Sequence, residues 1–183
     1  MYGIVNKAIQ GLVIEKFGEE AWENIKIKSG INISTFISND PYDDSVTYKL
    51  AGAAADVLQM KVEEVLFAFG EYWILKTGKE HYGSIMKAGG RNLKEFFKNL
   101  PNFHSRVMLM YPNITPPEFK IVDRMDGSIE LHYYSKREGL IDFMAGLISG
   151  LGKMFEEEIE IVKLKNRSHG LDHDEFHIIW KKM

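Results

Sequence analysis

The chain of 183 residues contains no cysteine, and neither sign of charge is in large excess. Without cysteine it can form no disulfide bond, cysteine-zinc site or thiolate-ligated metal centre, and this composition fits a reducing cytoplasm. A formal net charge of −3 argues against a nucleic-acid-binding protein, because such proteins usually carry basic surfaces. We therefore expect no nucleic-acid partner.

Long apolar runs are also lacking. The most apolar stretch, residues 143–152, is far too short to cross a bilayer and is broken by glycines. Residues 1–7 lack the basic region followed by an apolar region that would mark a signal peptide. The sequence predicts a cytoplasmic protein with no membrane segment.

Large apolar side chains, by contrast, are plentiful. Hydrophobic residues make up 45% of the chain and phenylalanine alone occurs 11 times, which is enough to build a core and to line an apolar cavity. The length fits one compact domain, and no linker divides the chain. We expect a single domain over residues 1–183.

The first two thirds of the chain predict helices. Apolar residues recur at helical spacing from Val5 onward, and the pattern stops at residues 29–30. The turn-rich segment 39–44 precedes a second helical stretch, and a further helix begins after residues 89–90. We expect this last helix to break at Pro101.

After residues 116–117 the periodicity changes from helical to strand-like. Two hairpins and a helix are predicted; in chain order they are strands 119–122 and 128–135, a helix near 138–156, and strands 158–164 and 175–180. This order favours an α+β fold, with a mainly helical N-terminal lobe packed on a C-terminal lobe that holds a small antiparallel sheet and a helix.

The predicted strand near residue 133 carries a group of hydrogen-bond donors. Because alternate residues of a strand share a face, Tyr133, Ser135 and Arg137 are expected to point the same way. Two hydroxyls and a guanidinium suit the binding of one or two carboxylates. The alternative is a solvated polar strand face.

Two groups of histidines are candidate metal ligands. His104 lies on a mostly apolar helix, where a neutral imidazole can ligate haem iron, although a hydrogen-bonded core histidine is the commoner outcome. Residues 168–174 and His177 supply three histidines and two aspartates. Their spacing matches no strong zinc pattern, so we expect a solvated loop there.

Together these features resemble the H-NOX family of haem–nitric oxide/oxygen-binding domains, especially the haem domain of the soluble guanylate cyclase β subunit and its cyanobacterial-type bacterial relatives. The resemblance runs through nearly the whole chain. It rests on residues 1–6, 42–48, 69–70, the His104 helix, 116–117 and 131–140.

The resemblance implies a role for each matching residue. His104 corresponds to the proximal iron ligand of a haem b (iron protoporphyrin IX) held between the two lobes. Tyr133, Ser135 and Arg137 correspond to the element that binds the haem propionates, and Pro117 to a proline that presses on the macrocycle. The alternative for Trp73 is a residue of the hydrophobic core, and the alternative for Pro117 is that it and Pro116 only end a helix. The candidates for the distal pocket are Val5, Ile9, Trp73, Thr77, Phe143 and Leu147.

The resemblance also implies ligand choice. Oxygen-binding members of the family place a distal tyrosine on the helix after the propionate element, whereas no tyrosine follows Arg137 here and Phe143 or a neighbour takes that place. The expected function is a sensor that binds nitric oxide and carbon monoxide at ferrous haem and excludes oxygen. Some bacterial relatives hold zinc through cysteines near the C-terminal hairpin, which this chain lacks.

The expected output is conformational. Weakening of the bond between His104 and iron would release a constraint between the lobes, and a separate partner, a histidine kinase or a cyclic-di-GMP enzyme, would respond. The chain has no room for an output domain, so it is not expected to be an enzyme. The alternatives are a haem enzyme of oxygenase or peroxidase type, with His81 or His132 as an acid-base group, and a haem-free carrier of apolar ligands.

Overall fold

A computed structural model describes residues 1–111 and 114–181. The helices are α1 (Gly3–Phe17), α2 (Glu19–Ser29), α3 (Asp44–Leu58), α4 (Val62–Tyr72), the π-helix η1 (Trp73–Gly78), α5 (Lys79–Ala88), α6 (Leu93–Lys98), α7 (Leu100–Met110), α8 (Ile141–Met154) and the short 3-10 helix η2 (Arg167–His169). The strands are β1 (Glu118–Asp123), β2 (Ile129–Tyr134), β3 (Ile159–Lys163) and β4 (Asp174–Trp180). Within the described part of the chain, no helix is long and apolar enough to cross a bilayer.

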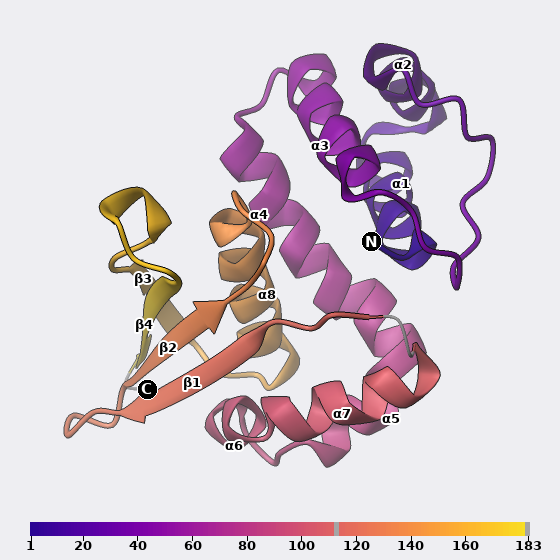
Figure 1. Ribbon diagram of the computed structural model, residues 1–183. Helices are drawn as coiled ribbons and strands as arrows, with labels where there is room; N and C mark the ends of the chain where they lie inside the picture. The colour runs from indigo at the N-terminus through magenta and orange to yellow at the C-terminus, as the bar shows by residue number, and fades with distance from the viewer. Residues whose placement is uncertain (112–113, 182–183) are drawn as a thin grey trace.

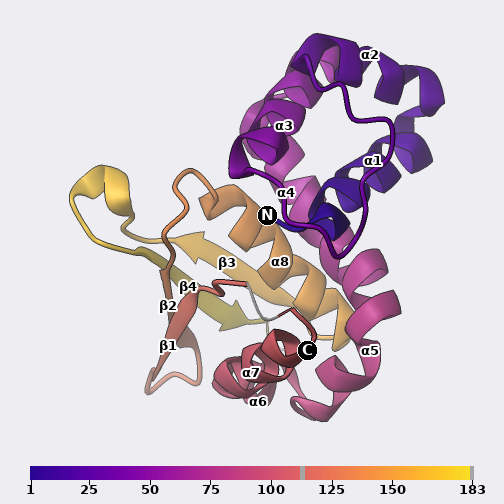
Figure 2. The ribbon, with the colours of Figure 1, turned by 45° about the vertical axis from the view of Figure 1, so that its right-hand side comes forward.

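The helical lobe is arranged around one long helical rod formed by α4, η1 and α5 (Figure 1). Figure 2 shows α1 and α3 beside α4, with α2 packed on the outer side of α1 and α3, while α6 and α7 lie beside α5. The end of α2 is the predicted one, because Gly30 adopts the left-handed conformation with φ 67° and its N–H bonds Ile27 O. A buried hydrogen bond of 2.7 Å from Thr47 Oγ1 to Asn6 Oδ1 ties α3 to α1.

Two helix details differ from the sequence prediction. Val62, Val65, Leu66, Phe69 and Trp73 are spaced as on a regular α-helix, whereas the rod becomes a π-helix at Trp73, a local insertion that such spacing does not reveal. The break expected at Pro101 falls instead at Asn99. The reason is that proline is tolerated in the first turn of a helix, where no N–H partner is needed, and Pro101 occupies that turn of α7.

The C-terminal lobe is the predicted pair of hairpins joined into one antiparallel sheet. Its strand order is β1-β2-β4-β3, so the second hairpin joins the first through β2 and β4. One face is buried: Ile129, Leu131 and Ile178 have no exposed surface, as the period of two requires. The α+β prediction is confirmed. The predicted strand 128–135 is shorter than expected, since β2 ends at Tyr134.

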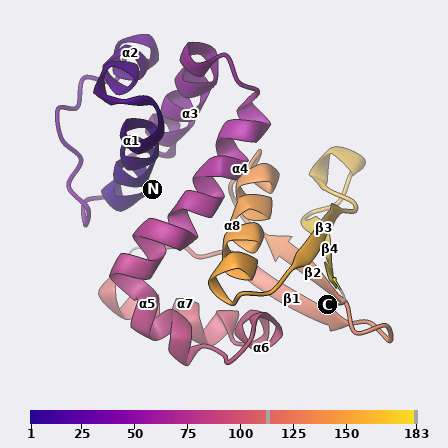
Figure 3. The same cartoon turned by 180° about the vertical axis from the view of Figure 1, so that it is seen from behind.

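Helix α8 lies between the sheet and the rod and connects the two lobes (Figure 3). It approaches α4 very closely where Gly146 faces Gly70. A methyl group built on Gly146 would lie 2.1 Å from the carbonyl oxygen of Phe67, and one on Gly70 would lie 2.2 Å from that of Phe143. Only glycine fits at these two positions without displacing one helix from the other.

The substitution Gly146→Ala should therefore destabilise the fold by about 2 kcal/mol, the usual cost of overpacking a rigid contact. Gly52→Ala is the matched control, because Gly52 also lies inside a helix but has open space where a methyl group would go. That change should stabilise the protein by up to about 1 kcal/mol. Urea unfolding measures both free energies, and a Gly146→Ala protein as stable as the parent would contradict the close contact.

Candidate functional site

A cavity of about 330 Å³ lies between the lobes. Its walls come from α1, α3, α4, η1, α5, α7, α8, β1, β2 and the segments that join them. The lining residues are Met1, Tyr2, Ile4, Val5, Pro41, Thr47, Tyr48, Ala51, Leu66, Phe69, Trp73, Tyr82, Phe103, His104, Val107, Tyr111, Ile114, Thr115, Pro117, Phe119, Tyr133, Ser135, Arg137, Leu140, Phe143, Met144 and Leu147. The volume is within the range of small-molecule sites, and the lining is mostly apolar.

His104 enters this cavity from the middle of α7 and rests on an aromatic stack. Its ring is stacked on Phe119 of β1 at 5.5 Å between centroids, with 22° between the planes. Phe119 in turn lies 5.6 Å from the ring of Tyr133 on β2. Burial lowers the pKa of His104 to about 4, because the charged imidazolium loses its hydration. The imidazole is therefore neutral near pH 7 and can offer a lone pair to a metal ion.

The three predicted donors all reach the cavity, although not as one strand face. Tyr133 lies on β2, whereas Ser135 and Arg137 follow the end of the strand. There the backbone N–H of Arg137 donates to Ser135 Oγ at 3.1 Å. Burial raises the pKa of Tyr133, so its hydroxyl stays protonated and can act as a donor.

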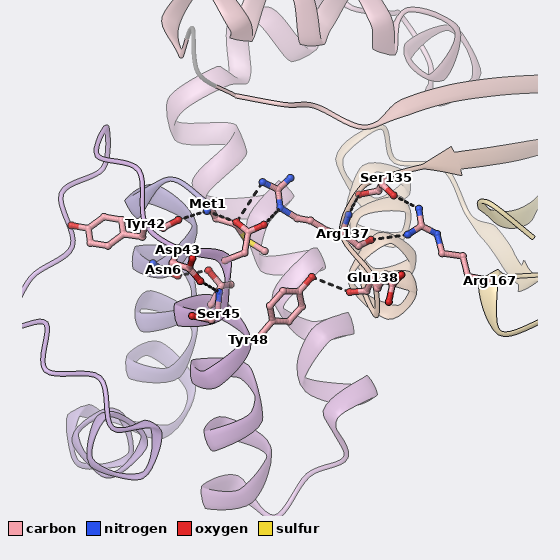
Figure 4. A network of polar contacts seen from close by, with 12 residues as sticks. Met1, Asn6, Tyr42, Asp43, Ser45, Tyr48, Ser135, Arg137, Glu138 and Arg167 are labelled. Carbon is pink, nitrogen blue, oxygen red and sulfur yellow. Dashed lines mark hydrogen bonds and ion pairs between the residues drawn. The ribbon is translucent and has the colours of Figure 1, made fainter.

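Arg137 binds a carboxylate, that of Asp44 in the first turn of α3. Its Nε donates to Asp44 Oδ2 at 2.8 Å, and the amino group of Met1 contacts Oδ1 of the same carboxylate. Figure 4 shows Arg137 extending from the turn after β2 toward these N-terminal elements. Partial burial alone would raise the pKa of Asp44, yet hydrogen bonds from Met1 and Arg137 hold this pKa below its usual value. The ion pair links the two lobes at the rim of the cavity.

Arg167 supports this turn and was not found by sequence reasoning. Its guanidinium donates to the backbone oxygen of Ser135 and, at 3.3 Å, to that of Arg137, as Figure 4 shows. Arg167 lies in η2, inside a polar loop without apolar periodicity. Nothing in the local sequence indicates a partner 30 residues away.

The candidates for the distal pocket divide into two groups. Val5, Trp73, Phe143 and Leu147 line the cavity, as does Pro117. Ile9 lines a separate small cavity beside α1 and α4, and Thr77 is buried in η1. Within the described part of the chain, neither of the last two is among the residues around the main cavity. The physical reason for Thr77 is the π-helix, since its wider turn rotates later side chains away from the α-helical face.

Several tyrosines that the sequence prediction did not consider also line the cavity. Tyr48 donates its hydroxyl to Glu138 O at 2.9 Å. The ring of Tyr82 lies 6.3 Å from that of Tyr111 between centroids, and burial raises the pKa of Tyr82. Their helical spacing could have marked them as inward-facing, but their position around one cavity depends on the tertiary fold.

This donor set suits one class of cofactor. A single neutral imidazole faces an apolar cavity, and a guanidinium with two hydroxyls lies at its rim. An iron porphyrin needs an axial nitrogen ligand, apolar walls for its ring and cationic donors for its carboxylates. The fold and the site therefore define a haem-binding protein of two lobes.

The comparison with known families gives the same result. The family model described as "Haem-NO-binding" matches residues 2–163. The chain therefore belongs to the H-NOX family of haem-based gas sensors, as its sequence motifs indicated.

Relatives and solved structures agree with this assignment. Soluble guanylate cyclase gcy-31 of Caenorhabditis elegans is 27% identical over 173 residues, which cover 94% of this chain and 24% of that protein. Guanylate cyclase soluble subunit beta-2 of Rattus norvegicus is 36% identical over 94 residues, 51% of this chain and 14% of that protein. The chain thus matches about a quarter or less of these relatives' length.

The fold is also that of solved H-NOX structures. An H-NOX protein from S. oneidensis in the Fe(II)NO ligation state has a TM-score of 0.89 and 21% identity, with both chains fully covered. The Fe(II) unliganded H-NOX protein from K. algicida has a TM-score of 0.86 and 21% identity, and 100% of this chain and 98% of that one are covered.

The position of Arg137 leads to a test of propionate binding. Arg137→Ala should speed haem transfer to excess apo-globin by about tenfold or more, because it removes a charge-assisted hydrogen bond to a carboxylate. Ser135→Ala should have a smaller effect. Asp44→Asn is the control that loses the ion pair but keeps the guanidinium, and it should retain haem better than Arg137→Ala. Parent-like haem loss in Arg137→Ala would exclude this role.

Proposed function

We propose that this chain is a ferrous-haem sensor that binds nitric oxide and carbon monoxide, excludes oxygen and signals to a separate partner protein. Its cofactor is haem b, and His104 is the iron ligand. The observation that supports this most directly is the placement of the histidines. All six lie in the described residues, and His104 alone lines the cavity.

When bound, the haem would supply a ferrous iron able to bind a diatomic gas, and nitric oxide would weaken the hold of the protein ligand on that iron. His104 provides the neutral nitrogen that this chemistry requires. Phe119, stacked on the imidazole, orients its ring. Arg137, Ser135 and Tyr133 provide donors for the propionates, and Pro117 provides a rigid wall against the ring.

The exclusion of oxygen follows from the lining contributed by α1, η1 and α8. Bound oxygen carries partial negative charge and is stabilised by a nearby donor, whereas nitric oxide and carbon monoxide depend on one far less. Val5, Phe143 and Leu147 offer no donor. The hydroxyl of Tyr48 already has a carbonyl partner. Trp73, through its indole N–H, is the donor most able to change this selectivity.

Signalling would begin at α7. His104 stacks on Phe119 of β1, so a change in what its imidazole binds would be passed from α7 to the sheet through this contact. The same helix exposes Leu109, whose surface is 85% accessible, so displacement of α7 would alter an exposed surface. A histidine kinase or a cyclic-di-GMP enzyme is the proposed partner.

A haem enzyme is the rival function. It would need an acid-base group near the bound ligand. His81 is exposed on α5 and His132 lies on the outer face of the sheet, so neither is placed for that role. We therefore propose that the chain itself has no catalytic activity, and an assay of turnover with peroxide tests this.

Substituting His104 with glycine should abolish haem retention, because the only histidine facing the cavity is lost. Added imidazole should restore binding by occupying the vacated space. Ser105→Gly is the control, since it places the same flexible residue on the same helix at an exposed position. The absorption spectrum of the purified ferrous proteins reports the outcome. An unchanged five-coordinate ferrous spectrum in His104→Gly would show that another group holds the iron.

Ligand selectivity gives a second test. The ferrous protein should bind nitric oxide and carbon monoxide but retain no oxygen in air-equilibrated buffer, since Val5, Phe143 and Leu147 offer it no hydrogen bond. Absorption spectra before and after exposure to air measure this. A long-lived oxygen-bound spectrum would overturn the proposed selectivity. If Trp73→Phe then removed that spectrum, the indole would be the donor responsible.

A further inference from the structure

A second group of metal-binding side chains lies outside the cavity, on the outer face of the sheet. His132 comes from β2, Glu175 from β4, and His173 directly precedes β4. His132 and Glu175 are register partners in the β2–β4 pairing. This arrangement brings together residues more than 40 positions apart, which is why the loop spacing alone indicated no metal site.

The three ligand atoms form a compact triangle. His132 Nδ1 lies 2.9 Å from His173 Nε2, His173 Nε2 lies 3.2 Å from Glu175 Oε1, and His132 Nδ1 lies 3.4 Å from the same oxygen. Zinc binds imidazole nitrogen and carboxylate oxygen at about 2.0–2.1 Å, so neighbouring ligands of a tetrahedral ion are about 3.3 Å apart. The triangle therefore matches one face of a zinc tetrahedron.

The partner on the far nitrogen of His173 leaves its Nε2 facing the other two ligand atoms. Asp172 Oδ1 lies 2.6 Å from His173 Nδ1, and a carboxylate only accepts, so it holds the Nδ1–H; in the neutral ring Nε2 then carries a lone pair, as metal binding requires. That lone pair faces the Glu175 oxygen, another acceptor. A proton on His132 Nδ1 can make a well-aligned hydrogen bond to His173 Nε2 or to Glu175 Oε1, but not to both. A cation at the centre satisfies all three atoms at once.

The neighbouring residues hold these side chains in place, as they do around metal ligands in proteins. The contact of Asp172 with His173 is the carboxylate–histidine pair that fixes the tautomer and ring orientation of a metal ligand. Tyr134 stacks on the same ring, with 4.4 Å between the ring centroids and 24° between the planes. The side chains of His132, His173 and Glu175 are 16%, 11% and 20% exposed, so they are held by the protein but leave an open side for water.

We propose that His132, His173 and Glu175 bind a zinc ion, with water as the fourth ligand. Two imidazoles and a carboxylate are ligands suited to zinc. The ion would fasten the start of β4 to β2, directly behind Tyr133, whose side chain faces the cavity from the opposite face of the strand. This inference does not depend on which gas the haem site binds.

The test is equilibrium dialysis of the chelator-treated, haem-loaded protein against micromolar zinc, with zinc and iron measured in the same samples. We expect about one zinc per chain, a higher melting temperature, and nitrogen and oxygen ligands in the zinc X-ray absorption spectrum. His132→Ala and His173→Ala should lose most of the zinc. Asp172→Asn should bind it about tenfold more weakly, as loss of an orienting carboxylate usually does.

The control is His169→Ala, an exposed histidine of the same loop that contacts Asn166 instead, and it should keep the zinc. Glu175→Gln keeps the shape of the side chain and loses its charge. Loss of zinc in this variant therefore cannot be attributed to misfolding. Zinc far below one per chain in the parent, or equal zinc in the parent and in Glu175→Gln and His173→Ala, would overturn the proposal. Because iron is counted separately, failure of the zinc site is distinct from failure of the haem site.

Discussion

The close approach of α4 and α8 is the constraint on which the rest of the structure depends. Gly70 and Gly146 let the two backbones meet without side chains between them, and packing in protein interiors is too dense to absorb even one extra methyl group there. Since α4 continues into the wall of the cavity and α8 carries Phe143 and Leu147, the same contact fixes the cavity's width. Strand β2 leads into α8 through residues 135–140, so the donors at the end of β2 are positioned through α8 as well.

Across the cavity the lobes are connected by interactions of a different kind. His104 stacks on Phe119, and Arg137 pairs with Asp44 at the rim. The first contact is apolar, and the second is an ion pair that is 29% and 38% exposed, so solvent weakens it. One side of the cavity is thus fixed by rigid packing, whereas the other is closed by contacts that can exchange partners. Such an asymmetry favours hinge-like movement over uniform expansion.

The sequence predicted what depends on local periodicity and turn chemistry. The helix end at Gly30, both hairpins and the α+β class follow from these signals, and the family resemblance supplied the roles proposed for His104 and Arg137. The π-helix was missed, because an inserted residue leaves an apolar stripe looking continuous. The pairing of Arg137 with Asp44 spans 93 residues, and the approach of His132 to His173 spans 41. Contacts of that range follow from the fold and leave no mark in local spacing.

The π-helix η1 has a consequence for how relatives of this chain should be aligned. A π-turn acts like one extra residue within a continuous helix, and each α-helical residue turns the axis by about 100°. Deleting a single residue between Trp73 and Gly78 would therefore swing α5 by roughly a quarter turn about its axis. Tyr82, which now lies 6.5 Å from Phe103 of α7, would face elsewhere. Family members with a regular α-helix here should show a one-residue gap in this segment.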